Sequence, residues 1–231
     1  MRLLAKIDTK SEYVIKGVQL EGVQKIGKIN DILNFLTTKN IREFCITDTL
    51  ASLYMRNNLI SIISEATSEF RYPICAGGGI KSIDDAVALI EAGSDRVVIN
   101  SHAQANPAII DTLTNKLGFS CVVSHIDVRK LDGEFHIFTH CGREMSTYNL
   151  IDWLHYLEIH KVGELLVTSI DRDGTMKGVD WELIEYLERN SSTPYIYSGG
   201  LENIAKLDDF NTLNAMSGLA VMTCMIQTET F

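Results

Sequence analysis

The sequence predicts an α/β fold, a single (β/α)8 barrel of parallel strands. Short runs rich in β-branched residues alternate with longer amphipathic runs along the chain, and eight such alternations are enough to close a barrel. The two halves, about 1–119 and 120–231, repeat one plan: Asp8 and Asp127 each end a strand-like run, and a glycine turn follows later, at residues 77–79 and 198–200. We therefore expect a two-fold barrel that occupies one domain of 231 residues.

The expected strands are short apolar runs, and the expected helices have apolar residues at helical spacing. Strands are expected at 2–8, 43–48, 73–76, 96–100, 121–127, 164–168, 195–197 and 218–222. Helices are expected at 29–38, 59–70, 83–92, 107–117, 148–159, 181–188 and 203–211. Few residues follow the eighth strand, so the eighth helix is expected to be truncated. A doubly wound open sheet is the alternative, and it accounts less well for the repeat of the two halves.

The composition is that of a globular protein with a large core, since 45% of the residues are hydrophobic and 22% are charged. The net charge of -9 argues against nucleic acid as the main partner, although backbone N–H groups can still bind phosphate. The N-terminus has no signal-peptide pattern, and no stretch is apolar for long enough to span a membrane. We expect a cytoplasmic protein with reduced thiols, because none of its five cysteines forms a C-x-x-C pair.

Acidic residues follow several predicted strands, at the end of a parallel barrel where active sites lie. They are Asp8, Asp48, Asp127, Asp171 and Asp173. Strands one and five of a barrel lie opposite each other, so Asp8 and Asp127 are expected to face each other across the mouth. Such a pair suits general acid–base catalysis if its surroundings separate the two pKa values. The alternative is that both are solvated strand-end residues, and the repetition of the two halves favours the catalytic interpretation.

Four turns at strand ends have the composition of anion-binding sites, because three of them contain glycine, which lets backbone N–H groups approach an anion closely. They are Gly77-Gly78-Gly79, Asn100-Ser101, Asp173-Gly174 and Ser198-Gly199-Gly200. Their placement predicts two phosphate sites on opposite sides of the mouth, and therefore an elongated substrate with a phosphate at each end. Ordinary tight turns are the alternative for any one of them taken alone.

Charged residues stand at the opposite, N-terminal ends of four predicted strands: Arg2, Glu43, Arg96 and Glu164. They are either solvated charges on the face that usually serves stability, or a ring of mixed sign that closes the bottom of the barrel and gates its interior. The histidines show no metal-ligand spacing such as H-E-x-x-H. We therefore assign no metal and no other cofactor.

From Arg2 to about Ile226, the chain resembles the HisF family, the cyclase subunit of imidazole glycerol phosphate synthase. The resemblance rests on Ile7-Asp8-Thr9-Lys10, Val14-Ile15-Lys16-Gly17, Ala76-Gly77-Gly78-Gly79-Ile80, Val98-Ile99-Asn100, Ile126-Asp127-Val128-Arg129-Lys130 and Ser198-Gly199-Gly200. Its most specific part is Thr168-Ser169-Ile170-Asp171-Arg172-Asp173-Gly174-Thr175.

The resemblance implies a barrel that forms a heterodimer with a glutaminase subunit and receives ammonia from it. In the family, ammonia reacts with a bis-phosphorylated ribulosyl-aminoimidazole carboxamide to give imidazole glycerol phosphate and an aminoimidazole carboxamide ribotide. Asp8 and Asp127 match the two acid–base residues of the family. Phosphate or substrate binding is implied for Lys16, Gly78, Gly79, Asn100, Ser101, Thr168, Asp173, Gly174, Ser198, Gly199, Gly200, Met222 and Thr223. The ammonia gate is matched by Arg2, Glu43, Arg96 and Glu164, and the glutaminase interface by Asp95.

The sequence departs from the family pattern near the expected site. Met222 and Thr223 stand where a small Ala-Ser pair is usual, Cys141 replaces a serine, and Tyr197 replaces an alanine. The first loop, residues 17–22, is more similar to HisF paralogues found with surface-polysaccharide genes, which work with a glutaminase in acetamidino-sugar formation. Three alternatives therefore stand beside histidine synthesis: that paralogue, the sister isomerase on the same barrel, and a non-catalytic ammonia conduit that activates its glutaminase.

Overall fold

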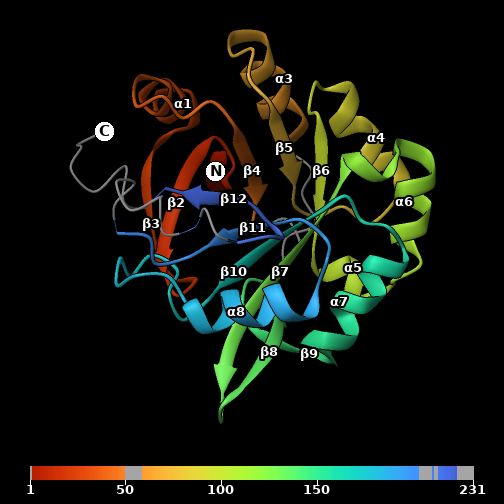
Figure 1. The fold of residues 1–231 in the computed structure, drawn as a ribbon. Coiled ribbons are helices and arrows are strands. Elements are labelled where there is room, and N and C mark those ends of the chain that lie inside the picture. Colours follow the sequence, from red (N-terminus) through yellow and green to blue (C-terminus); the bar gives the residue numbers. More distant parts are fainter. Residues whose placement is uncertain (1, 50–58, 203–209, 211–212, 223–231) are drawn as a thin grey trace.

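The computed structural model describes residues 2–49, 59–202, 210 and 213–222, and its strands close into the predicted barrel. The parallel strands are β1 (Arg2–Lys10), β4 (Phe44–Asp48), β5 (Ile74–Gly77), β6 (Arg96–Ile99), β7 (Val122–Leu131), β10 (Glu164–Ser169), β11 (Tyr195–Ser198) and β12 (Met216–Val221). Each pairs in parallel with the next, and β12 pairs with β1 to close the ring. Figure 1 shows the helices arranged around these strands. The predicted barrel is confirmed, and an open sheet is excluded.

Helices connect the strands on the outside of the barrel. They are α1 (Ile29–Thr38), α3 (Leu59–Glu69), α4 (Ile83–Glu91), α5 (Ser101–Ala105), α6 (Ile109–Leu117), α7 (Leu150–Ile159), α8 (Trp181–Asn190) and the 3-10 helix η1 (Phe119–Cys121). Six of the expected helices lie within two residues of these bounds. The seventh, at 203–211, falls almost wholly outside the described residues, as does the chain after Met222 on which the truncated eighth helix was expected.

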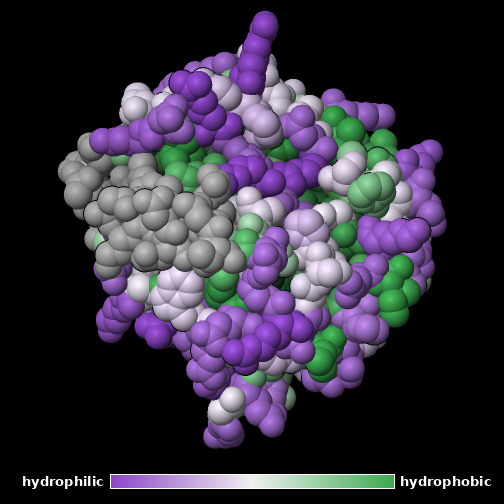
Figure 2. Space-filling model, viewed as in Figure 1, coloured by the Kyte–Doolittle hydropathy of each residue, from purple (hydrophilic) through white to green (hydrophobic). Residues whose placement is uncertain are grey.

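Local sequence explains where individual helices begin and which face they bury. Before α4, the Ser82 hydroxyl accepts a hydrogen bond from the Asp85 N–H, and the Asp85 carboxylate accepts one from the Ser82 N–H, which together form a capping box. Helix α1 buries Ile32, Leu33 and Leu36 on one face. None of the described helices is long and apolar enough to cross a membrane. Figure 2 shows hydrophilic side chains over most of the visible face, with apolar side chains in small separate groups.

Two antiparallel hairpins, which were not expected from the sequence, extend the barrel at its mouth. β2 (Tyr13–Val18) and β3 (Glu21–Lys28) follow β1, while β8 (Glu134–Thr139) and β9 (Glu144–Asn149) follow β7. The turn between β7 and β8 is Asp132-Gly133 with positive φ at both residues, the conformation that a two-residue hairpin turn favours. Since β1 and β7 hold equivalent places in the two halves, the hairpins extend the predicted two-fold repeat.

The interior of the barrel contains one apolar layer to which every barrel strand contributes one side chain. Its members, all buried, are Leu4, Cys45, Cys75, Val98, Val123, Leu166, Ile196 and Ala220. A second, larger core lies between strands and helices and contains the neighbours of opposite orientation, such as Ala5 and Ile7 of β1. The side chains that face inward from β1 are therefore Arg2, Leu4, Lys6 and Asp8, in order from the bottom of the barrel to its mouth.

The start of β12 is attached to helix α8 by the carboxylate of Glu188. Glu188 Oε1 accepts hydrogen bonds from Tyr195 Oη at 2.9 Å and from the Met216 N–H at 3.1 Å, and Oε2 accepts one from the Asn214 N–H at 2.9 Å. The variant Glu188→Gln replaces one acceptor oxygen by a donor, so we expect it to lower the free energy of unfolding by roughly 1–3 kcal/mol.

Urea denaturation measures this loss. The control is Glu185→Gln on the same helix, whose exposed carboxylate pairs with Arg189, and for which we expect a change of less than about 0.5 kcal/mol. Equal effects of the two substitutions would contradict the assigned role of Glu188.

Candidate active site

Asp8 lies on the inner face of β1, buried among cationic and polar groups. Both carboxylate oxygens accept hydrogen bonds from Lys6 Nζ at 3.1 Å, and Oδ1 accepts another from Thr47 Oγ1 at 3.0 Å. Lys16 Nζ lies 3.9 Å from Oδ2. Burial by itself would raise the pKa of the Asp8 carboxyl, but Lys6 and Lys16 outweigh it and hold that pKa below its ordinary value. Asp8 is therefore ionised at neutral pH and able to accept a proton.

Asp127 holds the equivalent place on β7, with a different set of partners. Asn100 Nδ2 donates to its Oδ2 at 2.9 Å, and His125 Nε2 lies 3.1 Å from its Oδ1. The same His125 nitrogen lies 3.0 Å from Thr168 Oγ1, and Oδ1 has no well-aligned hydrogen bond of its own. Burial raises the pKa of the Asp127 carboxyl, but His125 and Lys6 outweigh it and lower that pKa. This buried oxygen is thus held next to the His125 ring.

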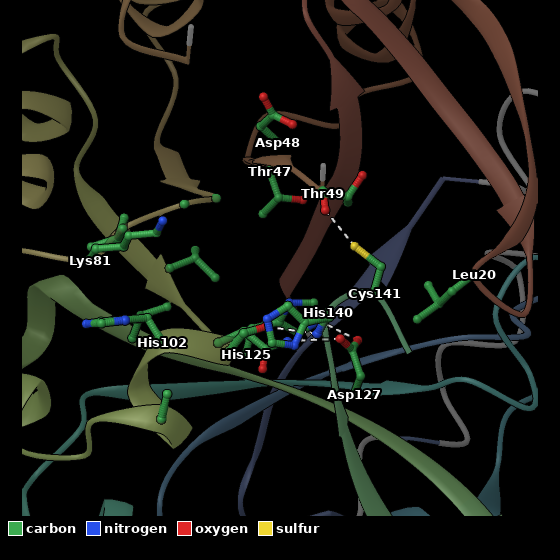
Figure 3. A pocket seen from close by; sticks show the side chains of 18 of the residues that line it. Leu20, Thr47, Asp48, Thr49, Lys81, His102, His125, Asp127, His140 and Cys141 are labelled. Carbon is green, nitrogen blue, oxygen red and sulfur yellow. Dashed lines mark hydrogen bonds and ion pairs between the residues drawn. The ribbon is translucent and has the colours of Figure 1, made fainter. Parts of the chain in front are cut away.

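Asp127 faces a cavity of about 260 Å³, which we call the Asn100 cavity after the residue on its wall. Gly78, Gly79, Asn100 and Ser101, all predicted to bind phosphate, also line it. In Figure 3 His125 and His140 lie beside Asp127, while Lys81 and His102 lie across the cavity.

Glycine is required at Gly78, where φ is +121° and an added Cβ would stand 2.4 Å from the Asp48 carbonyl oxygen. Glycine therefore lets this turn pack directly against the end of β4.

The second predicted phosphate site is much smaller than the first. Lys16, Asp173, Gly174, Ser198, Gly199, Gly200 and Met222 line a cavity of about 20 Å³, the Gly200 cavity, which has room for about one water molecule. Lys16 Nζ bonds both carboxylate oxygens of Asp173, at 2.8 and 2.9 Å. An added Cβ at Gly200 would stand 2.1 Å from the Gly178 carbonyl oxygen. A cavity of this size has no room for a phosphate group.

The structure does not bring Asp8 and Asp127 to one open cavity. Asp8 faces a third space of about 510 Å³, the hairpin cavity, which lies between the β2–β3 and β8–β9 hairpins and which Arg129 also lines. Cys141 stands between the hairpin cavity and the Asn100 cavity, and its Sγ donates to the Thr49 carbonyl oxygen. Burial raises the pKa of the Cys141 thiol to about 12, so the thiol remains a donor. This contact ties the β8–β9 turn to the end of β4.

The other predicted site residues lie at the margins. Thr168 is fully buried behind His125 and lines none of these cavities. Tyr197, on β11, accepts a hydrogen bond at its Oη from the Asp180 N–H at 2.8 Å. Asp95 is exposed next to the barrel bottom, and its carboxylate accepts a hydrogen bond from the Ile74 N–H at 2.8 Å. Thr223 lies outside the described residues.

Four charged side chains form a closed ring of ion pairs at the bottom of the barrel. Arg2 pairs with Glu43 at 2.9 Å and with Glu164 at 2.8 Å, and Arg96 pairs with Glu43 at 2.6 Å and with Glu164 at 2.5 Å. Ser217 Oγ also donates to Glu164 at 2.5 Å. Burial raises the pKa of Glu43, whereas the arginines and Ser217 outweigh burial at Glu164 and lower its pKa. The ring lies directly below the apolar layer that contains Leu4.

The carboxylates of the site give stability a definite pH dependence. The pKa values of Asp8, Asp127 and Glu164 are lower in the folded than in the unfolded protein. These carboxylates therefore stabilise the fold at pH values above their ordinary pKa, and this stabilisation is lost as the pH falls through their folded-state pKa values. Glu43, whose pKa is raised, acts in the opposite sense. We expect the urea midpoint to fall between about pH 5 and pH 3, and to fall less in Asp8→Asn than in the wild type. Parallel falls in both proteins would contradict the role of Asp8.

Comparison with known proteins agrees with this geometry. A family model of histidine biosynthesis proteins matches residues 2–229. The imidazole glycerol phosphate synthase subunit HisF of Legionella pneumophila is 39% identical over 212 residues, which cover 91% of this chain and 99% of the relative. The chain belongs to the HisF family. HisF of Thermotoga sp. (strain RQ2) is 35% identical over 86% of this chain and 79% of the relative. HisF of Chlorobaculum tepidum is 32% identical over 89% of this chain and 82% of the relative.

In this HisF-family chain, two basic residues that contact the aspartates were not predicted from the sequence. Lys6 and His125 each stand two positions before an aspartate, in Lys6-Ile7-Asp8 and His125-Ile126-Asp127. Alternation along a strand places residues i and i+2 on one face, so each basic group lies beside its carboxylate. The signal was visible in the sequence, since a basic residue interrupts an apolar run at the same place in both halves.

Proposed function

We propose that this chain is the cyclase subunit of an imidazole glycerol phosphate synthase in histidine biosynthesis. The observation that carries the proposal is the pair of buried, ionised aspartates at equivalent positions of β1 and β7, each next to a basic side chain. Asp127 lines the Asn100 cavity and Asp8 lines the hairpin cavity. The names of the HisF relatives support the same assignment. The glycine turns would hold the two phosphates of a ribulosyl-aminoimidazole carboxamide, with its reacting centre between them.

In this proposal the reaction is ring closure by ammonia with cleavage of a C–N bond. Asp8 and Asp127 transfer protons, because both are ionised in the free protein and can take a proton from the reacting nitrogen and return it. Asn100 holds Asp127 in place through a direct hydrogen bond. Lys16 would leave Asp173 to cover the second phosphate, which the small volume of the Gly200 cavity requires.

The proposal is tested by incubating the purified chain with the bis-phosphorylated ribulosyl-aminoimidazole substrate and ammonium chloride, and following the loss of substrate absorbance. Turnover without a glutaminase supports the cyclase assignment. Absence of turnover from a folded protein that still stimulates a glutaminase would overturn it, and would favour the paralogue that supplies ammonia for acetamidino-sugar formation. One observation favours this second function. Met222 stands where a small residue is usual in the HisF family, and its buried side chain forms part of the wall of the Gly200 cavity.

We infer that the chain receives its ammonia from a glutaminase bound near the bottom of the barrel, through the ring that contains Arg2 and Glu164. The variant Arg2→Ala removes two of the four ion pairs and leaves an opening below the apolar layer. We expect glutamine hydrolysis to continue while product formation from glutamine falls several-fold, and turnover with ammonium chloride to remain near the wild-type rate. The ratio of glutamate to product measures the coupling.

The control for Arg2→Ala is Arg71→Ala, which removes an exposed arginine outside the barrel strands. We expect this variant to keep the wild-type ratio of glutamate to product. A fully coupled Arg2→Ala enzyme would rule out a gating role for the ring.

A further inference from the structure

Lys6 is a buried cation at the centre of the proposed site that the proposed mechanism does not use. Its side chain is 3% exposed and lies on the inner face of β1, directly above the apolar layer. Among the described residues, it alone lines both the Asn100 cavity and the Gly200 cavity. A substrate that places one phosphate in each cavity must therefore pass the Lys6 ammonium at its midpoint.

The hydrogen bonds of Lys6 leave it able to bind a ligand. Its ammonium has three N–H donors, and its hydrogen bonds in the described structure go to Oδ1 and Oδ2 of Asp8, both at 3.1 Å. Its counterpart in the other half, His125, has its Nε2 between Thr168 and Asp127 instead. The two halves therefore differ in one respect: the β1 half presents a free N–H donor to both cavities.

We propose that Lys6 is a further catalytic residue, whose ammonium contacts the ketone oxygen of the ribulosyl group and protonates it while ammonia adds to the carbonyl carbon. This inference rests on the proposed function. The nitrogen lone pair forms the C–N bond, the carbonyl π pair moves to oxygen, and that oxygen takes a proton from Lys6 Nζ. The N–H⁺ of the adduct gives a proton to the Asp8 carboxylate, which returns it to Lys6. The product is a neutral carbinolamine, and both side chains regain their initial protonation states.

The surroundings of Lys6 favour this role over a nucleophilic one. Burial would lower the pKa of Lys6, but Asp8, Asp173 and Asp127 outweigh it and raise that pKa above its ordinary value. A lysine that stays protonated has no lone pair with which to attack the ketone. It can instead donate to the oxygen on which negative charge develops, in a site that excludes most water.

The first test is Lys6→Met, which keeps the length of the side chain and removes its charge. With ammonium chloride in excess, we expect kcat to fall by roughly 10²–10³-fold and KM to change far less. The acidic limb of the kcat pH profile should move to higher pH, because Asp8 loses its nearest cation. The control is Lys116→Met, which removes an exposed lysine of helix α6 and should leave both constants unchanged.

A second comparison separates action on the substrate from support of Asp8. If Lys6 only keeps Asp8 ionised, adding Lys6→Met to Asp8→Asn costs no further activity; if Lys6 acts on the ketone, the double variant is slower than Asp8→Asn alone. The double variant also removes both buried charges, so it tests the proposal even if Lys6→Met alone fails to fold.

A covalent adduct trapped by borohydride at Lys6 would overturn the proposal. Inactive wild-type protein would overturn the proposed function and this inference together, whereas full activity in Lys6→Met would overturn this inference alone.

Discussion

Replacement of Asp8 by asparagine is expected to lower turnover with ammonium chloride by roughly 10²–10⁴-fold. The asparagine side chain keeps the shape of the carboxylate and accepts a hydrogen bond from Thr47, but it cannot take a proton from the reacting nitrogen. Binding of the glutaminase should persist, because Asp8 lies near the mouth of the barrel and the charged ring lies at its bottom. Steady-state kinetics and a pull-down with the glutaminase measure the two effects separately.

The control for Asp8→Asn is Asp132→Asn, which changes an exposed aspartate in the β7–β8 turn, where φ is 49° and asparagine is well tolerated. We expect this variant to keep its full rate. Circular dichroism must show that Asp8→Asn is folded, since Lys6 loses its counter-ion there. Wild-type turnover in folded Asp8→Asn would remove the acid–base role.

Replacement of Glu164 by glutamine is expected to lower the free energy of unfolding by about 3 kcal/mol, which is the lower end of the range observed when one partner of a buried ion pair is removed. Glu164 is 5% exposed and bonds Arg2, Arg96 and Ser217. Glutamine keeps the size of the side chain but leaves two guanidinium groups with Glu43 as their shared counter-ion. The urea midpoint and slope give the change in free energy.

The matched control for Glu164→Gln is Glu12→Gln, in which an exposed glutamate in the β1–β2 turn loses its charge and the expected change is below about 0.5 kcal/mol. A loss of less than about 1 kcal/mol in Glu164→Gln would mean that water already screens the ring. In that case the ring would be too loosely held to block the bottom of the barrel.

The sequence determined the barrel and most of its elements. Apolar residues recur every two residues in strands and every 3.6 residues in helices, because each element must bury one face. Eight strands that alternate with helices are compatible with few folds other than the barrel. The helix at 29–38 was predicted with its observed bounds, and Asp8 and Asp127 were found because strand ends and the internal repeat are visible in the sequence. The two hairpins were missed, since their strands have weak periodicity: β3 is mostly exposed.

Only the tertiary structure decided which charges meet. Arg2, Glu43, Arg96 and Glu164 lie far apart in the chain, and closure of the barrel is what places them in one ring. It likewise decides that the Asn100 cavity is large while the Gly200 cavity, which the paired Lys16 and Asp173 line, is small.

Lys6 shows the same division between sequence and structure. Its position two residues before Asp8 is written in the sequence, and alternation along the strand is enough to place the two side chains on one face. Its contact with both cavities depends on the opposite wall of the barrel, which local sequence patterns do not encode. Long-range electrostatics and cavity shape arise from packing, and for that reason the sequence alone could identify the acids and the basic residue beside each, but not the cavities that they line.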